Sequence, residues 1–205
     1  YQAVNGAATK GMYAFLKHFA LNDQETHRDH LGIVTWADEQ TIREIYLKAF
    51  ELVIVDNNVT INYNKGTQNE DGTTTYTFTT VEVPAATAIM SSYNRIGPTW
   101  AGGNYDLITE VLRGEWGFNG FVLTDYEVAT YMFNDQCLAA GGDAKLKTVD
   151  LAGDFIQGYN LADHPQDMYF SREAAHHILY TVVHSNAMND FIHGAKYIPG
   201  FAYYK

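Results

Sequence analysis

The sequence predicts an α/β fold, in which a parallel sheet covered by helices forms part of an eightfold β/α barrel. Short apolar runs, typical of strands buried on both faces, alternate with longer segments of helical periodicity. This order favours parallel strands joined by helical crossovers. Roughly three or four such units fit into 205 residues, whereas a complete barrel takes about 250 residues. We therefore expect a partial (β/α)8 TIM-like barrel that is incomplete without a complementary segment.

The first part of the chain predicts a strand, a loop and a helix. Residues 12–21 form an apolar run typical of a buried strand and its exit. Residues 22–38 are polar without clear periodicity, so we expect a loop. A helix is predicted over residues 39–55, where apolar side chains recur at helical spacing and Asp38 or Thr41 can cap the start.

The next segment interrupts this pattern. Residues 56–84 are rich in Thr and Asn, with alternation in part of the segment and an Asp71-Gly72 turn signal near its centre. We expect a β-hairpin that projects from the main fold as a solvated decoration. The apolar run at residues 86–93 predicts the return to a buried strand.

The second part predicts three helices and two strands. Helices are expected over residues 104–116 and 127–140, with a buried strand at residues 120–126 between them. A short strand is expected at residues 148–154, and a last helix over residues 171–188.

A single domain accounts for most of these elements. We assign residues 1–190 to one partial-barrel catalytic domain, with the hairpin as an insertion, and residues 191–205 to a C-terminal tail.

Composition excludes several function classes. The net charge of −11 disfavours nucleic acid and anionic membrane surfaces as partners, because binding phosphates needs clustered Lys and Arg. No apolar run is long enough to span a bilayer. Cys137 is the single cysteine, so an intrachain disulfide is excluded. The His residues are scattered without a full ligand set, so we expect neither a metal nor another cofactor.

Polar side chains follow three of the expected strands. Lys17 and His18 end the first, Tyr93 lies just past the second, and Asp125 with Tyr126 ends the third. Parallel neighbours would bring these groups to one rim of the sheet, where barrel enzymes place their chemistry. Their mixture of donors and acceptors suits a neutral, polyhydroxylated ligand. The carboxylate at this position is a catalytic group, a ligand for a polar substrate or a helix N-cap.

Three separate blocks of the chain resemble glycoside hydrolase family 3. They are KHFALNDQETHR at residues 17–28, IMSSYN at residues 89–94 and LRGEWGFNGFVLTDY at residues 112–126. They occur in the family's order and cover roughly residues 11–130. The segment at residues 184–189 resembles members whose barrel domain follows the sandwich domain in the chain.

The resemblance implies a β-glucosidase that removes terminal non-reducing β-D-glycosyl residues by a retaining double displacement. Asp125 would be the nucleophile. The residues expected to bind the sugar are Lys17, His18, Arg28, Met90, Tyr93 and Tyr126. Of these, Tyr126 replaces the Trp that often follows the nucleophile in the family, which would reshape the stacking surface.

Structural alternatives stay open for these residues. Lys17 would otherwise be a solvated charge and His18 a core histidine, while Arg28 would form a loop ion pair. Tyr93 and Met90 would otherwise only pack in the core.

Two departures from the family bear on partners. In the family, the general acid/base is usually supplied from outside the barrel core. One branch of the family carries this group on a loop and has the sequence KHFPGHG, but this chain has KHFALND at the same place, which disfavours that branch. The upstream sugar-binding Asp and Arg of the family are also missing. We therefore expect a complementary barrel segment and a sandwich domain as partners, with a glucoside or oligosaccharide as substrate. The alternative is a non-catalytic sugar-binding or structural half of a multi-chain glycosidase.

The sequence does not indicate the compartment, so both a cytoplasmic and a secreted protein stay open.

Overall fold

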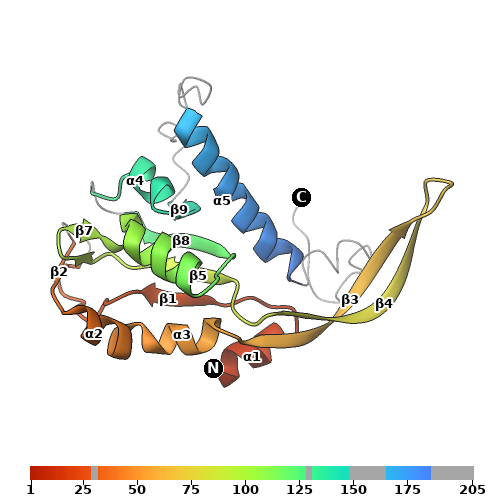
Figure 1. Cartoon of the computed structure of the whole chain (residues 1–205), viewed down its shortest axis with the longest axis horizontal. Helices are drawn as coiled ribbons and strands as arrows, with labels where there is room; N and C mark the ends of the chain where they lie inside the picture. The colour runs from red at the N-terminus through yellow and green to blue at the C-terminus, as the bar shows by residue number, and fades with distance from the viewer. Residues whose placement is uncertain (29–31, 128–130, 148–164, 186–205) are drawn as a thin grey trace.

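A computed structural model describes residues 1–28, 32–127, 131–147 and 165–185. Its centre is a four-stranded sheet in which all neighbouring strands are parallel (Figure 1). The strands lie in the order β1 (Phe15–Phe19), β5 (Ala88–Ser91), β8 (Phe121–Tyr126) and β9 (Ala144–Leu146). Within the described residues the sheet does not close on itself, which agrees with a partial α/β fold.

Two smaller sheets accompany the parallel one. A three-stranded sheet lies beyond the strand ends and is formed by β2 (Val34–Thr35), β6 (Arg95–Ile96) and β7 (Thr99–Trp100). A hairpin is formed by β3 (Asn58–Gln68) and β4 (Thr74–Pro84).

Helical segments of several types join these strands. They are α1 (Gln2–Ala8), α2 (Glu39–Thr41), the π-helix η1 (Ile42–Tyr46), α3 (Lys48–Ile54), the 3₁₀-helix η2 (Ala101–Gly103), the π-helix η3 (Asp106–Glu115), α4 (Asn134–Ala139) and α5 (Pro165–Val183). The predicted helix over residues 39–55 is thus present as α2, η1 and α3, and Asp38 caps it by accepting a hydrogen bond of 2.8 Å from the Thr41 amide. The helix predicted over residues 104–116 is present as η3.

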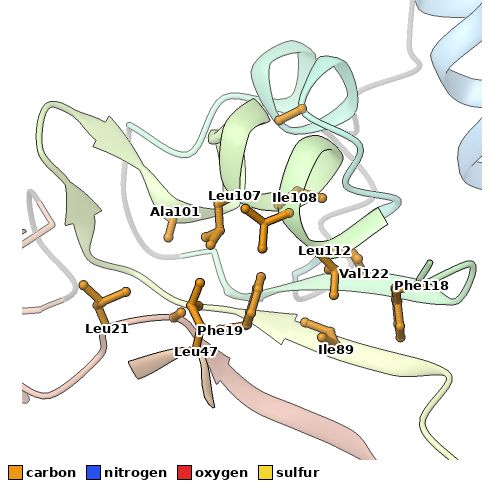
Figure 2. Close-up of a cluster of buried hydrophobic side chains, with 13 residues drawn as sticks. Phe19, Leu21, Leu47, Ile89, Ala101, Leu107, Ile108, Leu112, Phe118 and Val122 are labelled. Atoms are coloured by element: carbon orange, nitrogen blue, oxygen red, sulfur yellow. The ribbon is translucent and has the colours of Figure 1, made fainter. Parts of the chain in front are cut away.

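One apolar core fills the space between the sheet and the helices. In Figure 2, side chains from η3 point towards those of the sheet and of the segment between η1 and α3. Its largest fully buried members are Phe19, Leu47, Ile89, Ile108, Leu112 and Val122. Because Ile89 and Val122 occupy this face, the alternation of side chains turns their neighbours Met90 and Leu123 to the opposite face.

That opposite face is apolar but only partly covered. Phe15, Met90, Phe121 and Leu123 are half-buried, and the rings of Phe15 and Phe121 meet edge to face at 5.4 Å. In a complete barrel this face would point to the interior. Because the sheet is open in the described residues, nothing there covers this face fully, and its side chains are only half-buried.

Gly120 lets β8 begin in close contact with the residue before β5. A Cβ atom at Gly120 would lie 2.1 Å from the carbonyl oxygen of Thr87, well inside van der Waals contact. The same carbonyl accepts a hydrogen bond of 2.6 Å from the Thr181 hydroxyl of α5. Thr87 and Gly120 therefore lie where the starts of β5 and β8 meet α5.

The hairpin is present where the sequence predicts it, and its base is more buried than a solvated decoration would be. The pairs Val59–Val83 and Ile61–Val81 lie near the base, and Val59, Ile61 and Val83 form a buried cluster with Ala8 of α1. Beyond this base the hairpin projects from the molecule (Figure 1). Because it connects α3 to β5, it lies at the N-terminal end of the parallel strands.

Two predicted helices differ from the structure. The helix expected over residues 127–140 is reduced to α4, because Tyr131 and Met132 are instead buried in a cluster with Tyr93 and Trp100. The last helix begins earlier than expected, at Pro165, a residue suited to the first helical turn.

Other expectations fall partly or wholly outside the described residues. These are the strand at residues 148–154, the end of the last helix at residues 186–188 and the tail at residues 191–205. The fourth strand of the sheet lies just before the first of these, in β9. The helix α1 and the strand β2 occur where no element is expected.

Candidate functional site

Asp125 lies at the C-terminal end of β8 and is 8% exposed. Between Leu123 and Tyr126, two residues of β8 stand opposite one residue of β9, which makes a β-bulge. Bulges re-aim side chains and are common beside active sites. No helix follows Asp125 before Asn134 in the described residues, so the N-cap alternative is not realised there.

A second bulge positions His18. Leu16 pairs with Ile89 and Phe19 with Ser91, so Lys17 and His18 together stand opposite Met90 alone. The extra residue allows both Leu16 and Phe19 to pack in the core while His18 turns towards Asp125. The His18 Nε2 atom lies 3.1 Å from Oδ2 of Asp125.

Arg28, in the loop after β1, reaches the same carboxylate oxygen. Its Nη1 atom donates a hydrogen bond of 2.8 Å to Oδ2 of Asp125, and its Nε atom lies 2.9 Å from the carboxylate of Glu25. One guanidinium thus joins two carboxylates, one buried and one exposed. The contact with Glu25 is the loop ion pair of Arg28 that the sequence analysis leaves open as an alternative.

Tyr93 and Tyr126 complete the surroundings of the carboxylate. The guanidinium of Arg28 lies over the Tyr93 ring, 4.5 Å from its centroid, in a cation–π contact. The Tyr93 hydroxyl donates to the backbone carbonyl of Tyr126, and the Tyr126 amide donates a hydrogen bond of 2.7 Å to Oδ1 of Asp125. The Tyr126 side chain is exposed at the rim.

Burial is the main influence on the His18 imidazole. Burial lowers its pKa below 6.5, and the nearby cations Lys17 and Arg28 act in the same direction, whereas the Asp125 carboxylate opposes them. His18 is therefore neutral at pH 7, and with its proton on Nε2 it faces Asp125 as a neutral imidazole rather than as the cation of an ion pair. Nδ1 is then an acceptor.

Arg28 is charged under all ordinary conditions. Burial disfavours its charge, but hydrogen bonds to Asp125 and Glu25 outweigh this and raise its pKa. The site therefore holds a fixed positive charge beside one carboxylate oxygen.

Two of the predicted site residues lie apart from this group of contacts. Lys17 is exposed, and within the described residues it forms no ion pair with Asp125, although its charge acts on His18. Met90 lies half-buried on the open face of the sheet, opposite Leu123. The structure thus brings His18, Arg28, Tyr93 and Tyr126 to Asp125, and the sugar-binding roles of all these residues stay predictions.

A second polar cluster lies on the helix side of the sheet. The guanidinium of Arg113 donates to Asp143 at 2.9 Å, and the Asp143 carboxylate also accepts from the Val122 amide and lies 2.8 Å from Nδ1 of His177. Arg113 further donates to three backbone carbonyls, those of Phe118, Gly120 and Gly141. This arrangement joins η3, β8 and α5, and Arg113 acts as a structural ion-pair residue.

Within the described residues, no group of three or more His, Cys, Asp or Glu side chains is arranged to hold a metal ion. Cys137 is buried, which raises the pKa of its thiol to about 12, so it is not a reactive thiolate. The helices of the described part are too short or too polar to cross a membrane.

Known proteins named β-glucosidase share this chain's sequence and fold. A β-glucosidase from Ruminococcus albus is 32% identical over 123 residues, which is 60% of this chain and 10% of the relative. The crystal structure of the GH3 β-glucosidase from Bifidobacterium adolescentis superposes with a TM-score of 0.63 at 28% identity, covering 90% of this chain and 22% of that one. The chain is related to the family 3 β-glucosidases. The predicted resemblance is thereby confirmed for the segment that the relatives share.

Not every related protein carries the same name. An exo-α-(1→6)-L-arabinopyranosidase from Bifidobacterium longum is 35% identical over 123 residues, covering 60% of this chain and 12% of the relative. No family model matches the chain. The chain spans about a tenth of the length of the curated relatives it matches.

Proposed function

We propose that this chain is part of a β-glucosidase that cleaves terminal non-reducing β-D-glucosidic bonds by a retaining double displacement, with Asp125 as nucleophile. The observation that carries the proposal is the Asp125 carboxylate, which is buried at the C-terminal end of β8, contacted by His18 of β1 and held by Arg28 from the loop after β1. The relationship to proteins named β-glucosidase supports the reaction class.

In the first step, a carboxylate oxygen of Asp125 bonds to the anomeric carbon of the sugar, and the bond to the leaving oxygen breaks. That oxygen takes a proton from the general acid. In the second step, water attacks the anomeric carbon after losing a proton to the same group, now a base, and the ester bond to Asp125 breaks. Two inversions retain the configuration.

The contacts of Asp125 fit a nucleophile held in one orientation. Oδ2 accepts a hydrogen bond from Arg28 and lies 3.1 Å from Nε2 of His18, and Oδ1 accepts only from the Tyr126 amide among these contacts. Each carboxylate oxygen has two lone pairs, so Oδ1 retains one for attack.

Groups for binding the sugar surround this carboxylate. The neutral imidazole of His18 presents Nδ1 as an acceptor for a sugar hydroxyl, and the exposed ammonium of Lys17 is a donor at the same strand end. Tyr126 offers an exposed ring at the rim. Met90 would contact the sugar from the open face of the sheet.

The general acid/base comes from outside the described residues in this proposal. A retaining pair has its carboxyl groups about 5–5.5 Å apart. The nearest carboxylate joined to this network, that of Glu25, has an exposed side chain that forms an ion pair with Arg28. We therefore expect a complementary barrel segment and a sandwich domain to supply the acid/base, as in the sequence-based expectation.

The test is Asp125→Asn in the complete protein. We expect kcat for an aryl β-D-glucoside to fall by about 10⁴-fold or more, as when other enzymes lose their nucleophile. A 2-deoxy-2-fluoro-glucoside should label Asp125, which peptide mapping by mass spectrometry would locate. Asp106→Asn, which changes an exposed carboxylate on η3, is the matched control and should leave kcat unchanged. Full activity of Asp125→Asn, or label on another residue, would refute the role.

A second candidate concerns the sugar. The relative named exo-α-(1→6)-L-arabinopyranosidase favours α-L-arabinopyranosides as an alternative substrate class. The ratio of kcat/KM for the 4-nitrophenyl β-D-glucoside and α-L-arabinopyranoside decides between them. Sugar binding by the complete protein without hydrolysis of either would favour the non-catalytic alternative.

A further inference from the structure

Tyr131 is a buried residue of the segment between β8 and α4, outside the three blocks of the chain that carry the family resemblance. It is 6% exposed and belongs to the buried cluster formed with Tyr93, Trp100, Met132 and Cys137. Its hydroxyl is its only titratable or polar side-chain group, and it is directed to the loops that carry the site.

That hydroxyl reaches the backbone of two site residues. It donates a hydrogen bond of 2.9 Å to the carbonyl oxygen of Tyr93, and it lies 3.4 Å from the carbonyl oxygen of Arg28. These residues are 65 positions apart in the chain, since 93 − 28 = 65. One side chain therefore links the loop after β1 to the turn after β5.

The ring of Tyr131 is held from several sides. The guanidinium of Arg95 lies over it at 4.7 Å, and the Trp100 ring meets it edge to face at 6.3 Å. A Cβ atom at Gly32 would lie 3.0 Å from its Cζ atom, so the chain near Arg28 approaches the ring closely. A ring packed in this way gives its hydroxyl a defined position.

We propose that Tyr131 is a positioning residue that sets the Arg28 guanidinium against Asp125. It fixes the Tyr93 backbone, and the Tyr93 ring in turn carries the Arg28 guanidinium at 4.5 Å. Tyr131 itself makes none of the contacts to the carboxylate, so it acts through Arg28 and Tyr93. The kinetic part of this inference rests on the proposed function.

The decisive variant is Tyr131→Phe in the complete protein, which keeps the ring and removes the hydroxyl. We expect kcat/KM for the aryl glycoside, and the rate constant for labelling of Asp125 by the fluoro-sugar, to fall about five- to tenfold, the scale of one lost hydrogen bond. Tyr169→Phe on α5, where the side chain is exposed, is the matched control and should leave both unchanged.

A double-mutant cycle separates positioning from general destabilisation. If Tyr131 acts through Arg28, then Tyr131→Phe should cause little further loss in an Arg28→Lys background. The proposal would be overturned if the loss of kcat/KM in the double variant equalled the product of the losses in the two single variants. It would also be overturned if Tyr131→Phe had the same kcat/KM as the wild type.

A crystal structure of the Tyr131→Phe variant gives a readout independent of activity. We expect the Arg28 guanidinium to leave hydrogen-bond distance of Asp125 or to occupy more than one position. If the wild-type protein proves inactive, the proposed function fails, and this structure alone decides: an unmoved Arg28 overturns the positioning role, and a displaced one supports it.

Discussion

At the scale of single residues, two bulges decide the chemistry of the site. His18 and Asp125 both lie where two residues of one strand stand opposite one residue of its neighbour. Without the extra residue in β1, Leu16 and His18 would share a face, because side chains alternate along a strand. The bulge instead separates an apolar side chain of the core from the imidazole that contacts the carboxylate.

His18 gives a residue-scale prediction about pH. Its pKa in the folded protein is lowered from 6.5, chiefly by burial. At pH values between the folded pKa and the unfolded pKa of about 6.5, the unfolded chain therefore binds more protons than the folded one. Stability therefore rises with pH in this window, is fully present above about 6.5 and is lost as pH falls through the folded pKa. We expect the melting temperature to fall less between pH 7 and pH 5 in His18→Gln than in the wild type. His176→Gln, an exposed histidine of α5, is the control. Equal falls in all three proteins would contradict the prediction.

The sequence predicts which residues meet, but not how they are held. The three blocks place Asp125, His18, Arg28 and Tyr93 at one rim because parallel strands end together, and the structure brings these residues into contact. Tyr131 is different, because its partners are backbone carbonyls, which any residue type presents. No sequence pattern marks such a partner.

At the scale of elements, a buried ion pair and an exposed one fasten η3 to its surroundings. Arg113 of η3 meets Asp143 and three backbone carbonyls, and the Asp143 side chain is fully buried. Arg43 of η1 meets Glu115, the last residue of η3, and both of these side chains are exposed. The two pairs share their chemistry and differ in burial.

We expect this difference to appear in matched variants. Arg113→Met would leave the Asp143 carboxylate buried without its guanidinium and should cost about 3–5 kcal/mol of unfolding free energy. Arg43→Met breaks a solvent-exposed pair and should cost about 1 kcal/mol or less. Urea titrations of the complete protein would measure both. A loss in Arg113→Met no larger than that in Arg43→Met would show that the buried cluster does not hold η3.

The hairpin gives a second prediction at this scale. It lies in a helix-to-strand connection, at the end of the parallel strands opposite Asp125. Replacing residues 62–80 by Asn-Gly would remove the projecting part and keep the buried Val59–Val83 pair. We expect kcat/KM to stay within about twofold of the wild type, because barrel chemistry lies at the other face. A tenfold loss would show that the hairpin contributes to the site.

Elements were predictable from the sequence where local pattern and tertiary packing agree. The alternation and turn residues of the hairpin predict β3 and β4, and the apolar spacing at Leu107, Ile108, Val111 and Leu112 predicts η3. Residues 131–133 fail this test, because Tyr131 and Met132 gain more by packing under the site loops than by continuing a helix. The strand β9 has only three residues, too few to show a period.

At the scale of the whole molecule, the parallel sheet of this partial α/β fold has two open edges in the described residues. Within the described residues, β1 pairs only with β5 and β9 only with β8 in this sheet. Such edges are templates for further strands, and closure into a barrel removes them. The half-buried side chains of Phe15, Met90, Phe121 and Leu123 need the same closure.

We therefore expect the 205 residues expressed alone to lack a cooperative thermal transition and to bind the dye ANS, which reports exposed apolar surface. The net charge of −11 favours solubility, so this state can be distinguished from precipitation. The same residues within the complete protein should melt cooperatively, because neighbouring strands then cover both the edges and the apolar face. Circular dichroism and dye fluorescence, recorded on both proteins over the same temperatures, make the comparison. A monomeric isolated chain with a sharp melt would mean that the core between the sheet and η3 is sufficient for folding without a complementary segment.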